Sequence, residues 1–233
     1  MSLFHPFLQI VWYIRSQPSP HPYAGKPGSS GTGLRERGSS ALIEGPVKIA
    51  MVGACPFPCP RGTPIRILRL AEALAGRGHE VHVVTYHLAV GEAPPCLHVH
   101  RIPRIATYRR LAPGPSYQKL LVLDPLLTAK LRAVIRRHDI DVIHAHHYEG
   151  LVTGAIARGS ARLPLIYDAH TLLGPELSTY ALGLPAWLVG RFGRGLDRVL
   201  PRLADRSIAV SEAIARSLVA DAGLPAEQYR LGP

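Results

Sequence analysis

No stretch of the 233-residue sequence reaches the roughly 18 uninterrupted apolar residues that a membrane-spanning helix needs. Charged residues, proline and glycine interrupt every apolar run, so the sequence predicts no segment that crosses a bilayer. The apolar stretch from Leu3 to Ile14 has no basic segment before it and no small-residue cleavage site after it. We therefore expect no signal peptide.

Cysteine is scarce, since the chain contains only Cys55, Cys59 and Cys96. An odd number of cysteines in a long chain argues against a disulfide framework and favours a reducing compartment. The expected localisation is therefore the cytoplasm. Cys55 and Cys59 lack a second pair of cysteines or histidines at zinc-finger spacing, so we expect both to be loop residues that bind no metal.

Acidic side chains are few, 16 against 27 basic ones, and only four of the basic residues are lysine. An arginine-rich surface suits phosphate groups. The charge concentrates between Ala93 and Arg137, where nine basic side chains accompany one acid, Asp124. This segment can meet an anionic membrane peripherally, or it can simply be a solvated face. Because no aromatic residues are interleaved with the basic ones, we expect no nucleic-acid partner.

The chain changes character near residue 47. Residues 1–46 form an expected disordered leader, because Ser16 to Pro46 are dense in proline, glycine and serine. Residues 47–233 alternate short apolar runs with amphipathic segments, which predicts an α/β fold: a doubly wound, Rossmann-like parallel sheet. The expected strands are 47–53, 80–86, 97–102, 141–146, 164–169 and 206–210. The expected helices are 64–77, 118–137, 149–158, 185–203 and 211–222.

Ligands of doubly wound sheets bind beyond the carboxyl ends of the strands, so the residues that follow each strand are the functional candidates. After the first strand, Arg61, Gly62 and Thr63 precede a helix whose first N–H groups can bind an anion. Thr63 is the expected N-cap, because Pro64 suits the first helical position. The alternative is a plain connection rich in proline and glycine.

The fourth strand ends in three histidines, His144, His146 and His147, with Glu149 close behind. Zinc is one interpretation, but the histidines do not share one face, so we expect no metal. His146 is the catalytic candidate, because an imidazole beside a cleft can hydrogen-bond a sugar hydroxyl or a phosphate near neutral pH. We expect it to contribute little to folding. His147 is a further substrate-binding candidate, and His144 is expected to be a hydrogen-bonded core residue.

The fifth and sixth strands end in further polar residues. His170 follows Asp168 and, with Ser211 after the sixth strand, is a substrate-binding candidate; for Ser211, capping the next helix is the alternative. No G-x-S-x-G, HExxH or GxGxxG motif follows a strand, which argues against lipase-like hydrolases, zinc proteases and dinucleotide enzymes.

Four segments, in order, resemble the N-terminal domain of family-4-like glycosyltransferases: PFPCPRGTPIRILRLAEALAGRGHEVHVVTY, DVIHAHHYEG, PLIYDAHTL and ADRSIAVSEAIARSL. In this resemblance Arg61, Gly62 and Thr63 correspond to the family's glycine loop, near the donor diphosphate. His146 and His170 correspond to two strand-end histidines that line its cleft, and Ser211 to the serine of its "a-V-S-e" segment. The resemblance covers residues from about Val47 to Pro233.

The resemblance implies the GT-B architecture, in which two Rossmann-like domains face each other across a cleft. It implies a retaining enzyme that takes a nucleotide-sugar donor, transfers the sugar to a lipid or saccharide acceptor, and needs no cofactor. The sequence ends at Pro233, where the family continues into an Asn-Gly linker and a donor domain. We therefore expect the chain alone to be inactive. The alternatives are a truncated, inactive fragment and a Rossmann-like module that binds anionic lipid or polysaccharide.

Overall fold

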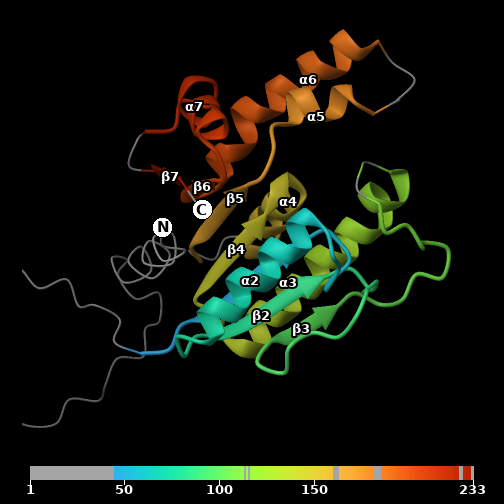
Figure 1. Ribbon diagram of the computed structural model, residues 1–233, viewed down its shortest axis with the longest axis vertical. Helices are drawn as coiled ribbons and strands as arrows, with labels where there is room; N and C mark the ends of the chain where they lie inside the picture. Colours follow the sequence, from blue (N-terminus) through green and yellow to red (C-terminus); the bar gives the residue numbers. More distant parts are fainter. Residues whose placement is uncertain are drawn as a thin grey trace, which may run out of the picture.

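The computed structural model of the chain describes residues 45–112, 114, 116–159, 163–180, 185–225 and 228–231. Almost all of the predicted leader, residues 1–46, lies outside these ranges. The described chain builds a parallel sheet in the order β3-β2-β1-β4-β5-β6-β7 (Figure 1). Its strands are β1 (Lys48–Gly53), β2 (Glu80–Thr85), β3 (His98–Arg101), β4 (Val142–His146), β5 (Leu165–Ala169), β6 (Arg206–Ala209) and β7 (Tyr229–Leu231).

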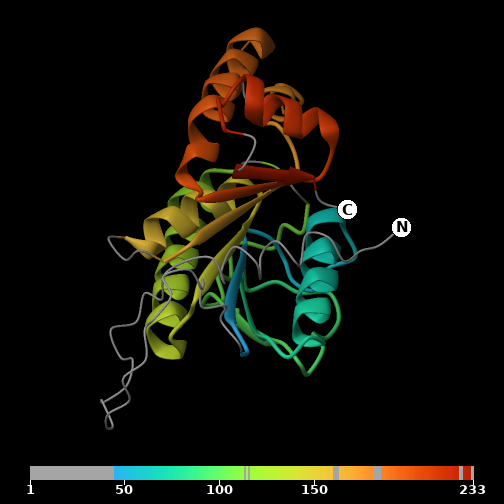
Figure 2. The ribbon, with the colours of Figure 1, turned by 90° about the vertical axis from the view of Figure 1, so that its left-hand side faces the viewer.

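Helices cover both faces of the sheet. They are α2 (Gly62–Ala75), α3 (Asp124–His138), α4 (His147–Arg158), α5 (Leu173–Ser178), α6 (Ala186–Val199) and α7 (Glu212–Ala220). A π-helical turn, η1 (Lys119–Leu123), precedes α3, and a 3-10 turn, η2 (Leu200–Leu203), follows α6. Figure 2 shows α2 on one side of the sheet and α3 and α4 on the other. The predicted doubly wound, Rossmann-like fold is therefore confirmed.

The apolar runs of the strands explain this layering. Along β1, Ile49 and Met51 pack toward α2, whereas Ala50 and Val52 belong to the core beneath α3, α4 and α7. All four side chains are fully buried. A parallel strand that is covered on both faces is apolar at most positions, because alternate side chains enter opposite cores. Burying one such side chain stabilises the fold by roughly 1.5–3 kcal/mol.

The predicted elements agree with the observed ones, with three differences. β7 and the short helix α5 are additional elements that the sequence did not predict. The start of α2 is also different: the helix begins at Gly62, and its N-cap is Arg61 without a side-chain cap. The expectation that Thr63 caps this helix is wrong, because its hydroxyl lies 3.2 Å from Nδ1 of His170.

Candidate active site

The candidate site lies at the carboxyl ends of three neighbouring strands, β1, β4 and β5. Gly53 at the end of β1 pairs in register with His146 at the end of β4, and His146 pairs with Asp168 in β5. Parallel strands end at the same edge of a sheet, so the residues that follow them are brought together.

Asp168 is the centre of a buried polar network. Arg66 of α2 binds both of its oxygens, with Nε at 2.8 Å from Oδ2 and Nη2 at 3.1 Å from Oδ1. Nδ1 of His146 and Nε2 of His170 lie 3.2 and 3.4 Å from Oδ2. The Thr63 hydroxyl extends the network to the far side of the His170 ring. A bidentate guanidinium with two imidazoles holds a buried carboxylate in one orientation.

The charge states of this network follow from burial and hydrogen bonding. Burial raises the pKa of Asp168, but hydrogen bonds from His146 and His170 outweigh it and hold the pKa well below its usual value. Burial lowers the pKa of His146 and lowers that of His144 still further. At neutral pH the site therefore contains an aspartate anion beside two neutral imidazoles, His144 and His146.

Asp168 also selects the tautomer of His146. Because Nδ1–H of His146 donates to the carboxylate, Nε2 carries a lone pair, and this buried atom has no hydrogen-bond partner within the described residues. His144 is likewise buried, and within the same residues neither of its ring nitrogens is hydrogen-bonded; Nε2 lies 3.9 Å from Asp168. The expectation of a hydrogen-bonded core histidine at position 144 is therefore wrong.

A cavity of about 260 Å³ adjoins the network. His146 belongs to its wall although the side chain has no exposed surface, so a ligand reaches this imidazole only when a neighbouring side chain shifts. The cavity is lined by Ala54, Cys55, Pro56, Cys59, Arg61, Gly62, Thr63, Pro64, Tyr86, Tyr108, Leu111, Ala112, Gly114, Lys119, His146, His147, Tyr148, Glu149 and Glu176.

Two paired carboxylates lie in the cavity wall. Lys119 forms an ion pair with Glu149, and their side chains are 8% and 16% exposed. Glu176 accepts a hydrogen bond from Thr171 and lies 3.3 Å from Nε2 of His147. Burial raises the pKa of Glu176, but its bonds to His147 and Thr171 outweigh burial and lower the pKa to about 2. The wall is therefore rich in ionised groups that already have partners.

The turn between β4 and α4 is sharp. His147, the first residue of α4, has φ of 64°, a left-handed conformation that is uncommon for a residue other than glycine. Gly150 then packs against the end of β1, where an added Cβ would lie 2.8 Å from the carbonyl oxygen of Val52. A glycine at this position lets α4 approach the strand closely and brings His147 to the cavity.

The loop between β1 and α2 is held by main-chain hydrogen bonds to the segment after β2. The N–H of Phe57 donates to the carbonyl of Leu88 at 3.0 Å, and that of Val90 to Pro58 at 2.7 Å. Arg101 of β3 donates to the carbonyl of Phe57 at 2.9 Å. This rigid loop delivers the chain to Gly62, where a Cβ would meet nothing within 4 Å. Open space therefore adjoins the positive end of the α2 dipole.

The structure gathers most of the predicted site residues. Arg61, Gly62, Thr63, His146 and His147 all belong to the cavity wall. His170 lies behind that wall and contacts Thr63 and Asp168. Ser211 is not a lining residue: its hydroxyl accepts the N–H of Ile214 at 3.4 Å and caps α7, as the alternative interpretation predicts.

Arg66, Lys119 and Glu176 were not predicted as site residues, and Asp168 was predicted only as a polar neighbour of His170. One signal was available: Arg66 lies about one helical turn beyond Gly62, on the side that faces the strand ends. Lys119 falls in a predicted helix, but its pairing with Glu149 depends on tertiary packing, and Glu176 comes from an unpredicted helix.

His144, His146 and Asp168 could hold a metal ion, since one ligand atom from each lies within 4.8 Å of the others. Both oxygens of Asp168 are already bound by Arg66, however. A metal ion would have to displace a guanidinium from a fully buried carboxylate, so the arrangement fits an ion-paired aspartate better than a metal ligand.

The basic segment from Ala93 to Arg137 does not form one surface. Arg104, Arg109 and Arg110 are exposed near the cavity. Arg132, Arg136 and Arg137 are exposed on α3, whose last residue accepts a hydrogen bond from Lys48 at the start of β1. Lys119 is buried in its ion pair. Among the described residues, no helix is both long and apolar enough to cross a membrane.

These features define a Rossmann-like domain whose candidate site lies where the strand order reverses, between β1 and β4. Comparison with known proteins adds the family. Residues 60–233 match the Glycosyltransferase Family 4 profile, so the chain belongs to this family. The predicted family resemblance is confirmed.

Two curated relatives show how much of a whole protein the chain represents. It is 30% identical over 191 residues to the sulfoquinovosyl transferase SQD2 of Arabidopsis thaliana, covering 80% of this chain and 34% of that protein. It is 28% identical over 127 residues to a phosphatidyl-myo-inositol mannosyltransferase of Mycolicibacterium smegmatis, covering 54% and 31%. The chain thus spans about a third of the length of these relatives.

Two solved structures share the fold. Sucrose-phosphate synthase from Thermosynechococcus elongatus superimposes with a TM-score of 0.61 at 19% identity, covering 82% of this chain and 48% of that one. HepE from Anabaena, in complex with UDP and glucose, superimposes with a TM-score of 0.50 at 23% identity, covering 79% and 44%. The GT-B N-terminal fold predicted from the sequence is confirmed.

Proposed function

We propose that the chain is the acceptor-side half of a retaining glycosyltransferase that uses a nucleotide-sugar donor. Family membership and the carboxyl-edge cavity support this proposal, and so does the presence of UDP and glucose in the structural relative HepE. The observation that carries it is the unpartnered Nε2 of His146, which Asp168 holds proton-free beside the cavity.

His146 is the proposed catalytic residue. Its neutral imidazole accepts a hydrogen bond from a hydroxyl of the acceptor or of the reacting sugar, and this bond strengthens as charge develops in the transition state. Asp168 is a positioning residue that fixes the tautomer of His146, and Arg66 binds both oxygens of that carboxylate. His170 and Thr63 support the same arrangement from behind.

The start of α2 is the proposed contact for the donor diphosphate. The first N–H groups of a helix lack intrahelical partners and carry the positive end of its dipole, so they bind phosphate oxygens without a metal. Arg61 adds an exposed positive charge, and Gly62 leaves room for a phosphate. His147 contributes a further polar group from the opposite wall.

Peripheral contact with an anionic membrane is part of the proposal. Arg104, Arg109 and Arg110 are exposed, and the same segment of the chain exposes two apolar side chains, Leu120 and Leu121, which are 66% and 68% exposed. Each basic residue near an anionic surface contributes on the order of 1 kcal/mol. One curated relative is named a phosphatidyl-myo-inositol mannosyltransferase, which supports a lipid over a saccharide acceptor.

We further propose that transfer needs a donor-binding half in addition to these 233 residues, because the matched part of the chain covers only 34% and 31% of the two curated relatives. The test compares the chain alone with the chain joined to the C-terminal half of a structural relative. Only the joined protein should turn over UDP-sugars, and NMR of the product should show a retained anomeric configuration. Turnover by the chain alone, or an inverted product, would overturn the corresponding part of the proposal.

Arg61→Ala in the joined protein tests the diphosphate contact, with Arg69→Ala as the matched control. Both arginines are exposed, but Arg69 lies two turns along α2 and pairs only with Glu72 among the contacts seen here. The KM for the donor should rise about tenfold for Arg61→Ala, the scale of one charged hydrogen bond, and should not change for Arg69→Ala. An equal change in KM for both variants would show that Arg61 does not contact the diphosphate.

A further inference from the structure

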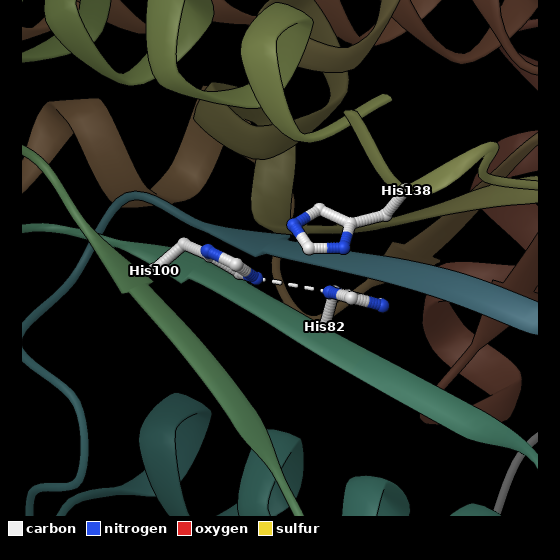
Figure 3. A group of neighbouring side chains, drawn as sticks. All are labelled: His82, His100 and His138. Carbon is white, nitrogen blue, oxygen red and sulfur yellow. Dashed lines mark hydrogen bonds between the residues drawn. The ribbon is translucent and has the colours of Figure 1, made fainter. Parts of the chain in front are cut away.

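A second group of histidines lies on the α3 side of the sheet. His82 projects from β2, His100 from β3, and His138 is the last residue of α3 (Figure 3). We call these three residues the amino-end cluster, because the carbonyl of His138 is hydrogen-bonded to Lys48, the first residue of β1. The proposed active site is at the opposite ends of the strands.

The ring nitrogens of the amino-end cluster converge. Nδ1 of His82 lies 2.9 Å from Nε2 of His100, and one nitrogen from each of the three rings lies within 4.8 Å of the others (Figure 3). Nitrogens bound to one tetrahedral zinc ion, at about 2.0–2.1 Å from the metal, are separated by roughly 3.3 Å. The rings therefore need to move by only about 1 Å to bind a common ion.

A carboxylate orients the central ring. Oε1 of Glu80 accepts a hydrogen bond from Nε2 of His82 at 2.8 Å. The neutral ring then presents the lone pair of Nδ1 to the cluster. A histidine that binds a metal through one nitrogen and donates its other N–H to a carboxylate is the usual second-shell arrangement of zinc sites.

Two rings of the cluster, His82 and His100, are neutral at physiological pH. Burial lowers the pKa of His82, and burial with the neighbouring histidines lowers that of His100 to about 4. Nε2–H of His100 donates to Nδ1 of His82 in the metal-free chain, so the proton of His100 moves to its Nδ1 when Nε2 binds the ion, with no net proton release from this neutral ring. Lys130 is a nearby cation that opposes a metal, and Glu80 is the carboxylate that offsets it.

We propose that His82, His100 and His138 form a binding site for a divalent first-row metal ion, of which zinc is the test case. Imidazole nitrogens suit zinc, copper and nickel. His82 is fully buried, whereas His100 and His138 are half-buried, so an ion can enter from solvent and keep a water molecule as its fourth ligand. The ion would join the edge strand β3 and the end of α3 to β2, which makes the site structural.

The experiment uses the full chain without a polyhistidine tag, stripped with EDTA and titrated with zinc chloride by calorimetry. One zinc ion per chain should bind with a micromolar or tighter Kd, and saturating zinc should raise the Tm by about 5 °C. Cobalt, used as a spectroscopic probe, should give the intense visible bands of a tetrahedral site.

Three variants locate the site. His138→Ala and His100→Ala should weaken zinc binding at least tenfold, and circular dichroism of the metal-free proteins should show retained folding. His98→Ala is the matched control, because this ring stacks on His82 at 4.9 Å but is not one of the three ligands. It should bind zinc like the unaltered chain.

His146→Ala tests the other group of residues that could hold an ion, which is His144, His146 and Asp168. Zinc binding that survives this substitution but not His138→Ala supports the proposal. No zinc binding, equal binding by His138→Ala and the unaltered chain, or loss only with His146→Ala overturns it.

Discussion

The two histidine groups of the sheet use the same side chain in different surroundings. In the group at the carboxyl ends, His146 and His170 share a fully buried Asp168 whose oxygens are both held by Arg66. In the amino-end cluster the carboxylate, Glu80, is 36% exposed and contacts only the outer nitrogen of His82 among the described contacts. A central anion orients imidazoles toward itself, whereas an outer one leaves their inner nitrogens facing one another, as the proposed metal site requires.

Replacing the two carboxylates should give the largest difference between the groups. Asp168→Asn leaves the Arg66 guanidinium without its anion in a buried setting and should reduce the free energy of unfolding by about 3–5 kcal/mol. Glu80→Gln removes a partly exposed charge and should cost less than about 1 kcal/mol. Denaturant unfolding of the full chain measures both changes. Equal losses of unfolding free energy would show that the two carboxylates contribute equally to stability.

The second largest difference between the two histidine groups should be in their effect on turnover. In the protein joined to a donor-binding half, His146→Ala should lower turnover about 100-fold, the usual scale for one acid-base group. His138→Ala, at the other end of the strands, should leave turnover unchanged. If both variants lose activity equally, the effect of His146 acts through folding.

His146→Ala should also affect stability, contrary to the expectation from the sequence that His146 contributes little to folding. The side chain is fully buried and bonded to Asp168, so its removal should reduce the free energy of unfolding by about 1–3 kcal/mol. A metal-free chain whose Tm is unchanged by this substitution would show that the hydrogen bond is weak.

Acid should destabilise both groups, in different pH ranges. The folded-state pKa of His100, about 4, lies below the value of about 6.5 in an unfolded chain, so the unfolded state binds more protons between these values. Stability should therefore fall as pH decreases from about 6.5 to 4, by about 1 kcal/mol for this half-buried group after solvent screening. His100→Gln should flatten this part of the pH–stability curve.

Asp168 acts at lower pH. Its folded-state pKa lies well below the usual value, so its contribution is complete above about pH 4 and is lost only as pH falls toward the folded-state value. In Asp168→Asn, stability should depend less on pH below 4, while the loss between pH 6.5 and 4 remains. Unfolding curves at pH 3, 5 and 7 test both ranges.

The smallest effect should come from Gly62→Ala. Its Cβ would meet no atom within 4 Å, and alanine favours helices, so stability should rise by up to about 1 kcal/mol. Donor binding in the joined protein should weaken severalfold, because the methyl group enters the proposed phosphate space. Gly150→Ala is the control: its Cβ would lie 2.8 Å from a carbonyl oxygen, so it should destabilise the fold by about 1–3 kcal/mol.

The fold was largely predictable because β1, β2, β4 and β5 are mostly apolar, and both of their faces are buried. β7 was not, because its three residues include the exposed Arg230 and Leu231 and give no periodic signal. At the site, Arg61 to Thr63 and His146 could be placed from strand ends alone. The centre of the network could not, because Asp168 is identified by what surrounds it: Arg66 lies 102 positions away in the sequence.

The amino-end cluster shows the same limit. His82 and His100 fall in predicted strands, but their pairing depends on the register between β2 and β3, in which Val84 lies opposite His100. The approach of His138 depends on how far α3 extends, and the helix ends one residue beyond the predicted boundary. Spacing along the chain therefore carried no metal signature.

Main-chain hydrogen bonds hold the loop after β1 against the segment after β2. These bonds decide whether the loop loses its conformational entropy during folding or on ligand binding. A mobile phosphate loop loses its conformational freedom at each encounter with a ligand, and this loss subtracts from affinity. Here that freedom is lost once, during folding. Amide hydrogen exchange between residues 55 and 61 should consequently be slow before any ligand arrives and should change little on binding. At the proposed diphosphate contact, discrimination between donors would then depend on the shape and charge of a preformed surface.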